Sequence, residues 1–194
     1  MERHIEKYFG KYVNVFHEIS SPDIHVDICI IEPTSERNYY TLVTMGMGAH
    51  RMKVPEVLAD KKLDRAEILV TLPSDWEIHN QAERWYWPIR WLKILAHLPG
   101  EEDSWLGYGH TIPNGEPFAD NTDLCCVLLT MPCFFGTECA VCALPNGNAV
   151  NFYQIVPLYE KEVEYKIKYG IKTLEELFGD DFDMVKDIHR PSIC

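Results

Sequence analysis

The sequence lacks any long hydrophobic run. No apolar segment reaches the roughly 18–20 residues that a helix needs to cross a bilayer. Residues 1–12, MERHIEKYFGKY, also lack the apolar stretch of a secretory signal peptide. These absences argue against a helical membrane protein, and they predict a cytoplasmic location with no membrane partner.

Positive charge is also scarce. The 194 residues include 18 Lys and Arg against 30 Asp and Glu, which gives a net charge of −12 at pH 7. Domains that bind nucleic acid usually present a basic patch, so we expect no nucleic-acid partner. An acidic surface attracts basic proteins and speeds their encounter, although the same charge also serves solubility alone.

Signatures of nucleophilic and redox catalysis are missing. The sequence has no G-x-S-x-G nucleophile elbow, and its C-x-x-C motif, Cys139 to Cys142, has no second copy. This motif leads into a predicted strand, whereas a redox pair usually opens a helix. Seven cysteines in a chain without an export signal also argue against a disulfide framework. We expect Cys139 and Cys142 to act as small core residues.

The segment Gly46-Met47-Gly48 lacks the third glycine and the following helix of a dinucleotide-binding loop. Pro55, shortly after it, disfavours a helix through this stretch. We therefore interpret the segment as a bend at which two backbones approach closely.

The sequence does contain clear hydrophobic periodicity, and its length fits one domain over residues 1–194. The pattern predicts helices over 3–19, 88–98, 157–169 and 173–179, a long loop with one short strand over 100–120, and strands over 24–30, 39–45, 65–72, 124–131, 140–144, 149–156 and 185–188. These elements indicate an α+β fold, in which helices pack on a mainly antiparallel sheet.

Two of the predicted strands carry further detail. Strict alternation over 24–30 places the aliphatic side chains on one face and His25, Asp27 and Cys29 on a polar face. Asn146-Gly147 predicts a tight hairpin turn with positive φ at both residues.

Four residues form a candidate metal site. His25 and Asp27 share a strand face, and His50 and His110 each follow a Gly-x-Gly segment. If the loops converge, these residues form a His/Asp site, and a metal-dependent hydrolase or a small-ligand-binding domain is the alternative function. The fixed spacing of a zinc motif is absent. A structural hydrogen bond is the commoner role for such a pair, so no cofactor is predicted.

The run Trp85-Tyr86-Trp87 is the most distinctive aromatic feature. Such side chains dominate both hydrophobic cores and interface hot spots. Three consecutive aromatic side chains cannot all point inward from one element, so we expect at least one at a surface or a groove wall.

Six sequence blocks, taken in order, resemble the bacterial suppressor-of-fused-like domain family over about residues 24–191. The blocks are TLVTMGMGAHRM, RAEILVTLP, WYWPIRWLKILAHLP, WLGYGHTIPNGEPF, NFYQIVPLYEKEVEYKIKYG and VKDIHRP. The resemblance implies an α+β sandwich that serves as a non-catalytic protein-binding module and not as an enzyme.

The same resemblance implies a protein partner. Bacterial members of the family have been proposed as immunity proteins that neutralise a cognate toxin, and the net charge of −12 suits a basic toxin. In the animal relative a partner peptide docks as an added strand. The matching residues here are Trp105, Tyr108 and His110, which join Trp85, Tyr86 and Trp87 as partner-binding candidates. The oligomeric state is not predicted.

Overall fold

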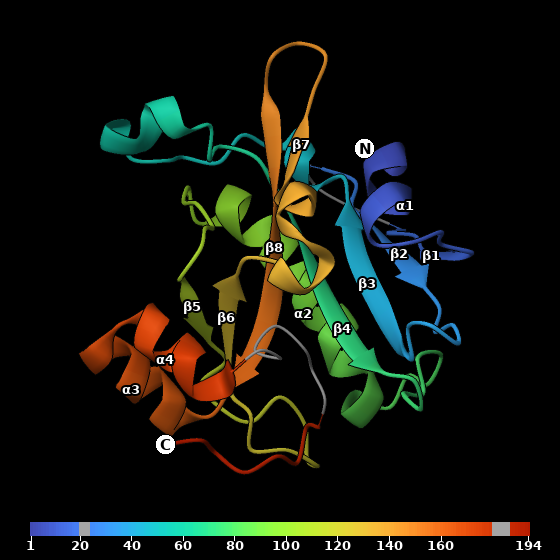
Figure 1. Ribbon diagram of the computed structural model, residues 1–194, viewed down its shortest axis with the longest axis vertical. Helices are drawn as coiled ribbons and strands as arrows, with labels where there is room; N and C mark the ends of the chain where they lie inside the picture. The colour runs from blue at the N-terminus through green and yellow to red at the C-terminus, as the bar shows by residue number, and fades with distance from the viewer. Residues whose placement is uncertain (20–23, 180–186) are drawn as a thin grey trace.

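The computed structural model describes residues 1–19, 24–179 and 187–194, and one mixed β-sheet forms its centre (Figure 1). The strands are β1 (Asn14–Phe16), β2 (Asp27–Ile31), β3 (Tyr39–Met45), β4 (Ala66–Pro73), β5 (Thr111–Pro113), β6 (Cys126–Thr130), β7 (Val141–Ala143) and β8 (Ala149–Leu158). The α-helices are α1 (Glu2–Tyr8), α2 (Glu83–Glu101), α3 (Glu160–Tyr169) and α4 (Ile171–Phe178). Short 3₁₀ helices are η1 (Met47–Ala49), η2 (Glu56–Lys61), η3 (Cys133–Phe135) and η4 (Thr137–Ala140).

The sheet has the strand order β1-β2-β3-β4-β8-β6-β5, and β7 pairs with β8 outside this path. β4 and β8 run parallel, whereas the other pairs among the described strands are antiparallel. The predicted α+β fold with a mainly antiparallel sheet is therefore confirmed. β1 and β5 form the two ends of the sheet, at the right and left of Figure 1.

The central parallel pair carries buried polar contacts. The Asn151 side chain of β8 donates to the carbonyls of Lys62 and Arg65, at 2.9 and 3.1 Å, just before β4. Further along, Gln154 of β8 donates to the hydroxyl of Thr71 in β4 at 3.2 Å, and both residues are buried. These bonds fix the register between the two halves of the sheet, because a shifted strand would leave buried polar groups unpaired.

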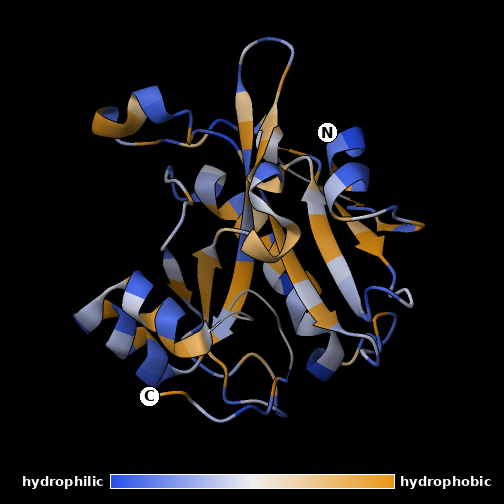
Figure 2. Cartoon of the chain, viewed as in Figure 1, coloured by the Kyte–Doolittle hydropathy of each residue, from blue (hydrophilic) through white to orange (hydrophobic). Residues whose placement is uncertain are grey.

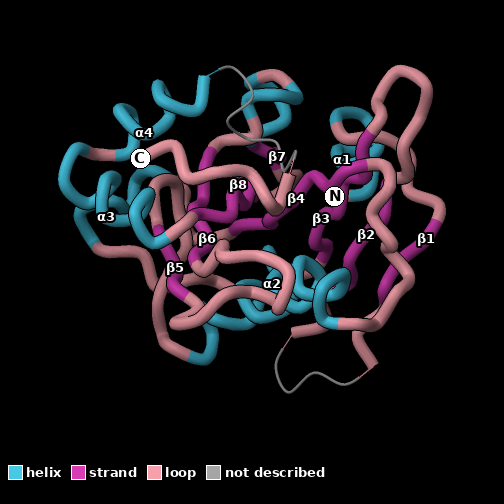
Figure 3. Tube along the Cα trace, turned by 90° about the horizontal axis from the view of Figure 1, so that it is seen from below, coloured by secondary structure: helices cyan, strands magenta, loops and turns pink. Residues whose placement is uncertain are grey.

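Apolar side chains cover both faces of the sheet, and the strands are mostly orange in Figure 2. α2 packs on one face, in the same cluster as Ile28 and Ile68. α1 packs on the opposite face, where Ile5 and Phe9 join Val43. Figure 3 shows α1 and α2 on opposite sides of the strands. α3 and α4 cover the β6–β8 end. Within the described residues, no helix combines the length and the apolar character required to cross a membrane.

This double coverage corrects the polar face predicted for residues 24–30. β2 begins at Asp27, and Cys29 on the predicted polar side is fully buried. Cys139 and Cys142 are buried in the same cluster, so their predicted role as small core residues is confirmed. A strand packed on both faces needs apolar residues on both, and Cys29 serves as one of them.

The strand predicted over 39–45 coincides with β3, and the hairpin of β7 and β8 is confirmed. Its turn differs from the prediction, because Gly147 has φ of 82° whereas Asn146 is not among the described residues with positive φ. The Leu144 amide donates to the Asn148 carbonyl at 2.8 Å and the Gly147 amide to the Leu144 carbonyl at 3.0 Å. This is a three-residue connection with glycine at the left-handed position.

The helix predicted over 3–19 is wrong beyond Tyr8, where α1 ends. Gly10 follows with φ of 120°, and a Cβ atom there would lie 2.2 Å from the Arg37 guanidinium, which itself donates to the Phe9 carbonyl. Residues 14–16 then form β1 and pair with β2. Their backbone groups are satisfied by the sheet, which overrides the helical spacing.

Helix boundaries also differ from the predictions elsewhere. α2 starts at Glu83 and contains both Pro88 and Pro99, because burial of its apolar side stabilises a helix that proline would otherwise interrupt. Pro157 belongs to β8, and α3 starts only at Glu160. Thr173 lies inside α4, where its hydroxyl donates to the Tyr169 carbonyl and does not cap the helix. Of the strand predicted over 185–188, residues 185–186 lie outside the described residues, and residues 187–188 do not form a strand.

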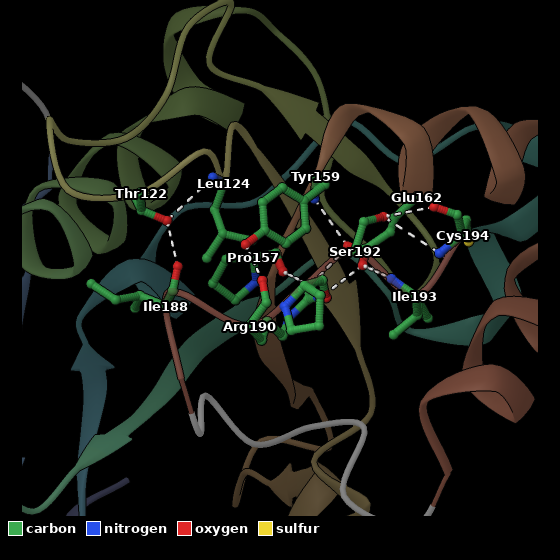
Figure 4. A network of polar contacts seen from close by, with 11 residues as sticks. Thr122, Leu124, Pro157, Tyr159, Glu162, Ile188, Arg190, Ser192, Ile193 and Cys194 are labelled. Atoms are coloured by element: carbon green, nitrogen blue, oxygen red, sulfur yellow. Dashed lines mark hydrogen bonds and ion pairs between the residues drawn. The ribbon is translucent and has the colours of Figure 1, made fainter.

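An ion pair fastens the C-terminal segment to the helices (Figure 4). The Glu162 carboxylate in α3 is fully buried, and both Arg190 terminal nitrogens reach it, at 2.5 and 2.7 Å. The Arg190 guanidinium also lies over the rings of Tyr159 and Phe178, at 5.0 and 4.9 Å from their centroids. The Ile193 amide adds a hydrogen bond to Glu162 at 3.1 Å.

Replacing this arginine tests the contribution of the pair to stability. We expect Arg190→Met to lower the free energy of unfolding by about 3 kcal/mol, because it leaves a buried carboxylate without its cation. The double variant Arg190→Met/Glu162→Gln should recover part of that loss, since the uncompensated charge is gone. Urea denaturation measures both, and a single-variant loss below about 1 kcal/mol, as for a surface pair, would contradict the assignment.

Candidate protein-binding site

The strand β5 lies at one end of the sheet and directly follows the predicted partner-binding residue His110. Its inner side pairs with β6, with Ile112 opposite Val127. At either end of β5, the His110 carbonyl accepts the Leu129 amide of β6 at 2.9 Å, and the Asn114 amide donates to the carbonyl of Cys125, just before β6, at 2.8 Å. Because hydrogen-bonding direction alternates along an antiparallel strand, the backbone groups of Thr111 point away from β6. In the described part of the chain, no strand pairs with that outer side.

The loop before β5 holds two of the predicted partner-binding residues in contact. The Trp105 and His110 rings pack edge to face, 4.4 Å between centroids. A Cβ atom at Gly107 would lie 2.5 Å from the Trp105 ring, so this position needs glycine. Burial lowers the pKa of His110, and the positive charge of Lys166 acts in the same direction. The imidazole is therefore held uncharged against the indole.

Tyr108 is the third predicted partner-binding residue of this loop. Its ring is 39% exposed, and its hydroxyl donates to the Glu175 carboxylate of α4 at 2.9 Å. The Thr130 hydroxyl of β6 donates to the other oxygen of Glu175 at 3.0 Å. Burial together with this hydrogen bond raises the pKa of Tyr108 to about 12. The loop is thus fixed to both α4 and β6, which orders the surface before any partner arrives.

A cleft of about 430 Å³ opens beside the C-terminal end of β5, between that strand and α3. Its charged lining residues are Glu116, Asp123, Glu160 and Glu164, all of them exposed. No Lys or Arg is among the described residues that line this cleft, so the charged side chains described there are all negative.

A second depression of about 610 Å³ continues the acidic surface toward α2. It shares Glu116 and Asp123 with the first cleft and adds Glu83 and Asp120. Arg90 also lines it, but its guanidinium already donates to Glu83 at 2.7 Å. The two depressions together form one acidic groove, which we name the β5 groove.

The thiols in the β5 groove are not activated. Burial raises the pKa of Cys125, and the nearby Glu160 carboxylate acts in the same direction. Burial also raises the pKa of Cys126 to about 12. A protonated thiol is a poor nucleophile. The carboxylates of the groove, and not its thiols, therefore suit it to binding a cationic ligand by charge and hydrogen bonding.

The aromatic run at 85–87 lies mainly in the core. Trp87 is fully buried and stacks on Phe118 with 4.8 Å between ring centroids, so the prediction of partner contact is wrong for Trp87. Trp85 and Tyr86 are half-buried against the same cluster. The Trp85 ring packs edge to face on Trp76 at 5.1 Å, and Tyr86 keeps its hydroxyl near Lys93 at 3.1 Å.

The predicted metal ligands are only partly brought together. His25 and Asp27 are in contact, with 2.9 Å between Nε2 and Oδ1. The third group at this point is His17, which the sequence analysis did not single out. His50 ends η1, and His110 packs on Trp105, and neither belongs to the cluster of potential ligand atoms found among the described residues.

The Gly46-Met47-Gly48 segment binds a carboxylate of the protein itself. The amides of Gly46 and Gly48 donate to one oxygen of Glu67 at 2.9 and 3.0 Å, and the Thr44 hydroxyl donates to the other at 2.7 Å. Gly46 has φ of 126°, and a Cβ atom there would lie 2.1 Å from the His25 carbonyl. The predicted close approach of two backbones is confirmed.

Several important residues were missed by sequence reasoning. Glu67 is almost fully buried within the apolar strand RAEILVTL, and a lone carboxylate in such a strand was the available signal. Arg190 stood within the family block VKDIHRP, but nothing in the sequence pointed to Glu162 as its partner. The acidic residues of the β5 groove come from separate segments, which only the fold joins.

A sheet covered on both faces, with edge strands β1 and β5 at its ends and an acidic groove beside β5, fits a non-catalytic protein-binding module. Comparison with known proteins gives the family. The family model described as "Suppressor of fused protein (SUFU)" matches residues 22–191. This chain therefore belongs to the suppressor of fused protein family, which confirms the resemblance found in the sequence blocks.

Solved structures share this fold. A suppressor-of-fused homologue from Neisseria gonorrhoeae superposes with a TM-score of 0.71 at 17% identity, over 99% of this chain and 93% of that one. The Sufu–Fu complex structure gives 0.67 at 15% identity, over 98% and 89%. Drosophila Suppressor of Fused gives 0.60 at 16% identity, and this chain matches 87% of its own length to 42% of that protein.

The chain is also similar in sequence to the uncharacterized protein UU111 of Ureaplasma parvum serovar 3. The two are 27% identical over 169 residues, which is 87% of this chain and 80% of the relative.

The buried carboxyl beneath the glycine bend predicts a pH dependence of stability. Burial raises the pKa of Glu67 from 4.5 to about 7, against the opposing effect of its hydrogen bonds. Between these values the folded protein holds a proton that the unfolded chain releases, so this group lowers stability as pH rises. From pH 5 to pH 8 the loss should be roughly 2–3 kcal/mol.

Urea denaturation of the wild type and Glu67→Gln at both pH values checks this effect. The glutamine variant should lack this decline, so its stability relative to the wild type should improve on going from pH 5 to pH 8. Glu101→Gln, at an exposed position, is the control. An unchanged difference between wild type and Glu67→Gln at the two pH values would show that Glu67 does not titrate in this range.

Proposed function

We propose that this chain is a non-catalytic binding module of the bacterial cytoplasm that neutralises a basic protein, in particular a cognate toxin. It would do so by occluding the functional surface of that partner. The observation that carries the proposal is the acidic β5 groove beside a strand edge with which none of the described strands pairs. A family relative whose structure is a complex, that of Sufu with Fu, supports protein binding as the class of function.

The edge of β5 and the groove supply different parts of the binding energy. The outward backbone groups of Thr111 can pair with an extended segment of the partner, as strand addition requires. Lys or Arg side chains of that segment would then face Glu160 and Glu164 across the groove. Backbone pairing gives affinity with little sequence preference, whereas the carboxylates select a basic partner.

The loop carrying Trp105, Tyr108 and His110 gives the other end of this surface. Trp105 and His110 are half-buried and Tyr108 is exposed, so the loop presents aromatic area next to Thr111. Aromatic side chains that are already ordered lose little entropy on binding. We assign these three residues as the apolar contacts of the interface. Trp85 and Tyr86, which are half-buried in α2, remain further candidates for partner contact.

The net charge also contributes to the rate of association. A surface of net charge −12 attracts a cationic toxin over distances of about 8–10 Å at ordinary salt. Fast capture matters for a neutralising protein, because free toxin is harmful until it is bound. Association should therefore slow strongly as salt is raised.

Charge reversal in the groove tests the proposal with a matched control. Glu160→Lys/Glu164→Lys places two cations in the groove, whereas Glu2→Lys/Glu6→Lys makes the same change of net charge on exposed positions of α1. We expect the groove variant to bind the product of a neighbouring toxin-like gene at least about tenfold more weakly, and the α1 variant to bind nearly as the wild type.

Binding kinetics measured by surface plasmon resonance, together with rescue of cell growth during toxin expression, provide the readout. Thermal unfolding confirms that both variants fold. Equal weakening by the two variants would mean that only overall charge matters. If no basic protein encoded beside this gene binds, or binding does not restore growth, the immunity function is wrong.

A further inference from the structure

Three potential metal ligands meet at the opposite end of the sheet from β5. Oδ1 of Asp27 lies 2.9 Å from Nε2 of His25 and 3.2 Å from Nδ1 of His17. One ligand atom from each residue lies within 4.8 Å of the other two. This cluster takes no part in the proposed partner-binding surface.

The strand register explains why these residues converge. β1 and β2 pair antiparallel with Phe16 opposite Ile28, so continuing the register places His17 opposite Asp27. Directly opposed side chains of an antiparallel pair lie on the same face, and residues two apart on a strand also share a face. His25 lies just before β2, and its Nε2 reaches Asp27 at 2.9 Å. The strand register thus places His17 and Asp27 opposite each other, and His25 completes the cluster from the adjoining segment.

Neighbouring contacts hold the cluster in place. The Glu18 carboxylate accepts the Val26 amide at 2.9 Å and contacts Nε2 of His97 in α2 at 2.8 Å. These bonds anchor the residues next to His17 and His25. On the far side of His25, Gly46 of the glycine bend allows close backbone approach to the His25 carbonyl. A site of this kind needs such support to keep its ligands in register.

Accessibility differs among the three ligands in a way that suits ion entry. The Asp27 side chain is only 15% exposed, whereas those of His17 and His25 are 72% and 58% exposed. The carboxylate thus forms the inner wall, and the two imidazoles reach it from the solvent side. An ion bound here would keep coordination positions open to water or to a ligand from another molecule.

We propose that His17, His25 and Asp27 form a binding site for a divalent transition-metal ion of the zinc type. Two imidazole nitrogens and one carboxylate oxygen are the donor set that Zn²⁺, Co²⁺ and Ni²⁺ accept, whereas Mg²⁺ and Ca²⁺ prefer oxygen ligands alone. To bind the ion, each imidazole nitrogen that now contacts Asp27 would present a lone pair to it, with the ring proton on the other nitrogen. The bound ion would tie the end of β1 to β2 and stabilise the fold.

The test uses the full chain after chelator treatment and titration with ZnCl₂, CoCl₂ or MgCl₂. Cys133 and Cys194 are exposed thiols that could bind zinc independently, so all measurements use the Cys133→Ser/Cys194→Ser background. Isothermal titration calorimetry should show one zinc per chain and no magnesium binding. Cobalt should give visible absorption bands of a site with nitrogen and oxygen ligands, and zinc should raise the thermal unfolding temperature.

Single variants identify the ligands. His17→Ala, His25→Ala and Asp27→Asn should each weaken zinc binding at least about tenfold. Removing a residue that only supports a metal ligand already lowers metal affinity by about this factor, so removing a ligand itself should lower it at least as much. His189→Ala, an exposed histidine on the C-terminal segment, is the matched control and should bind as the background protein does. Circular dichroism checks that each variant folds. The site is wrong if zinc does not bind saturably, or if the His17 and His25 variants bind it as well as the control.

Discussion

The parallel pairing of β4 with β8 is the interaction on which the other features depend, because it joins the meander β1–β4 to the unit β8-β6-β5. Buried polar side chains fix its register: Asn151 on the carbonyls before β4, and Gln154 on Thr71. Glu67 of β4 accepts hydrogen bonds from the amides of Gly46 and Gly48, which follow the neighbouring strand β3. With the centre fixed in this way and both faces covered, backbone remains open for pairing at the two ends of the sheet.

The two ends of the sheet carry different chemistry. At β5 the open edge lies beside carboxylates and a loop fastened by the bond from Tyr108 to Glu175, which suits an extended basic partner. At β1 the strand register gathers His17, His25 and Asp27, which suits a metal ion. Long-range charge attraction would bring a partner to the β5 end of the sheet. Metal binding at the β1 end would depend on short-range coordination geometry. The proposal of a protein-binding site and the proposal of a metal site can therefore be tested independently.

Much of the fold could be predicted from the sequence where one local signal dominated. β3 followed from an apolar, aromatic run and the β7–β8 hairpin from Asn146-Gly147, whereas the helix over 3–19 was wrong because pairing of β1 with β2 overrode the apolar spacing. The family and the loop around Trp105 were predictable because their motifs are continuous. The β5 groove and the Arg190–Glu162 pair were not, since each joins residues distant in sequence that only the tertiary fold brings together. His17 was missed for a different reason: the helix predicted over 3–19 hid β1, whose pairing with β2 places His17 opposite Asp27.

The central claim is that a basic partner occupies the β5 edge. Backbone hydrogen exchange of the chain alone and in complex with its partner, resolved by residue with NMR, tests it most directly. The account predicts new protection at the Thr111 amide, which points away from β6, together with protection in the loop at 105–110 and unchanged exchange in β1. Protection confined to β1, or to the α1 face, with Thr111 exchanging as in the free chain, would contradict it.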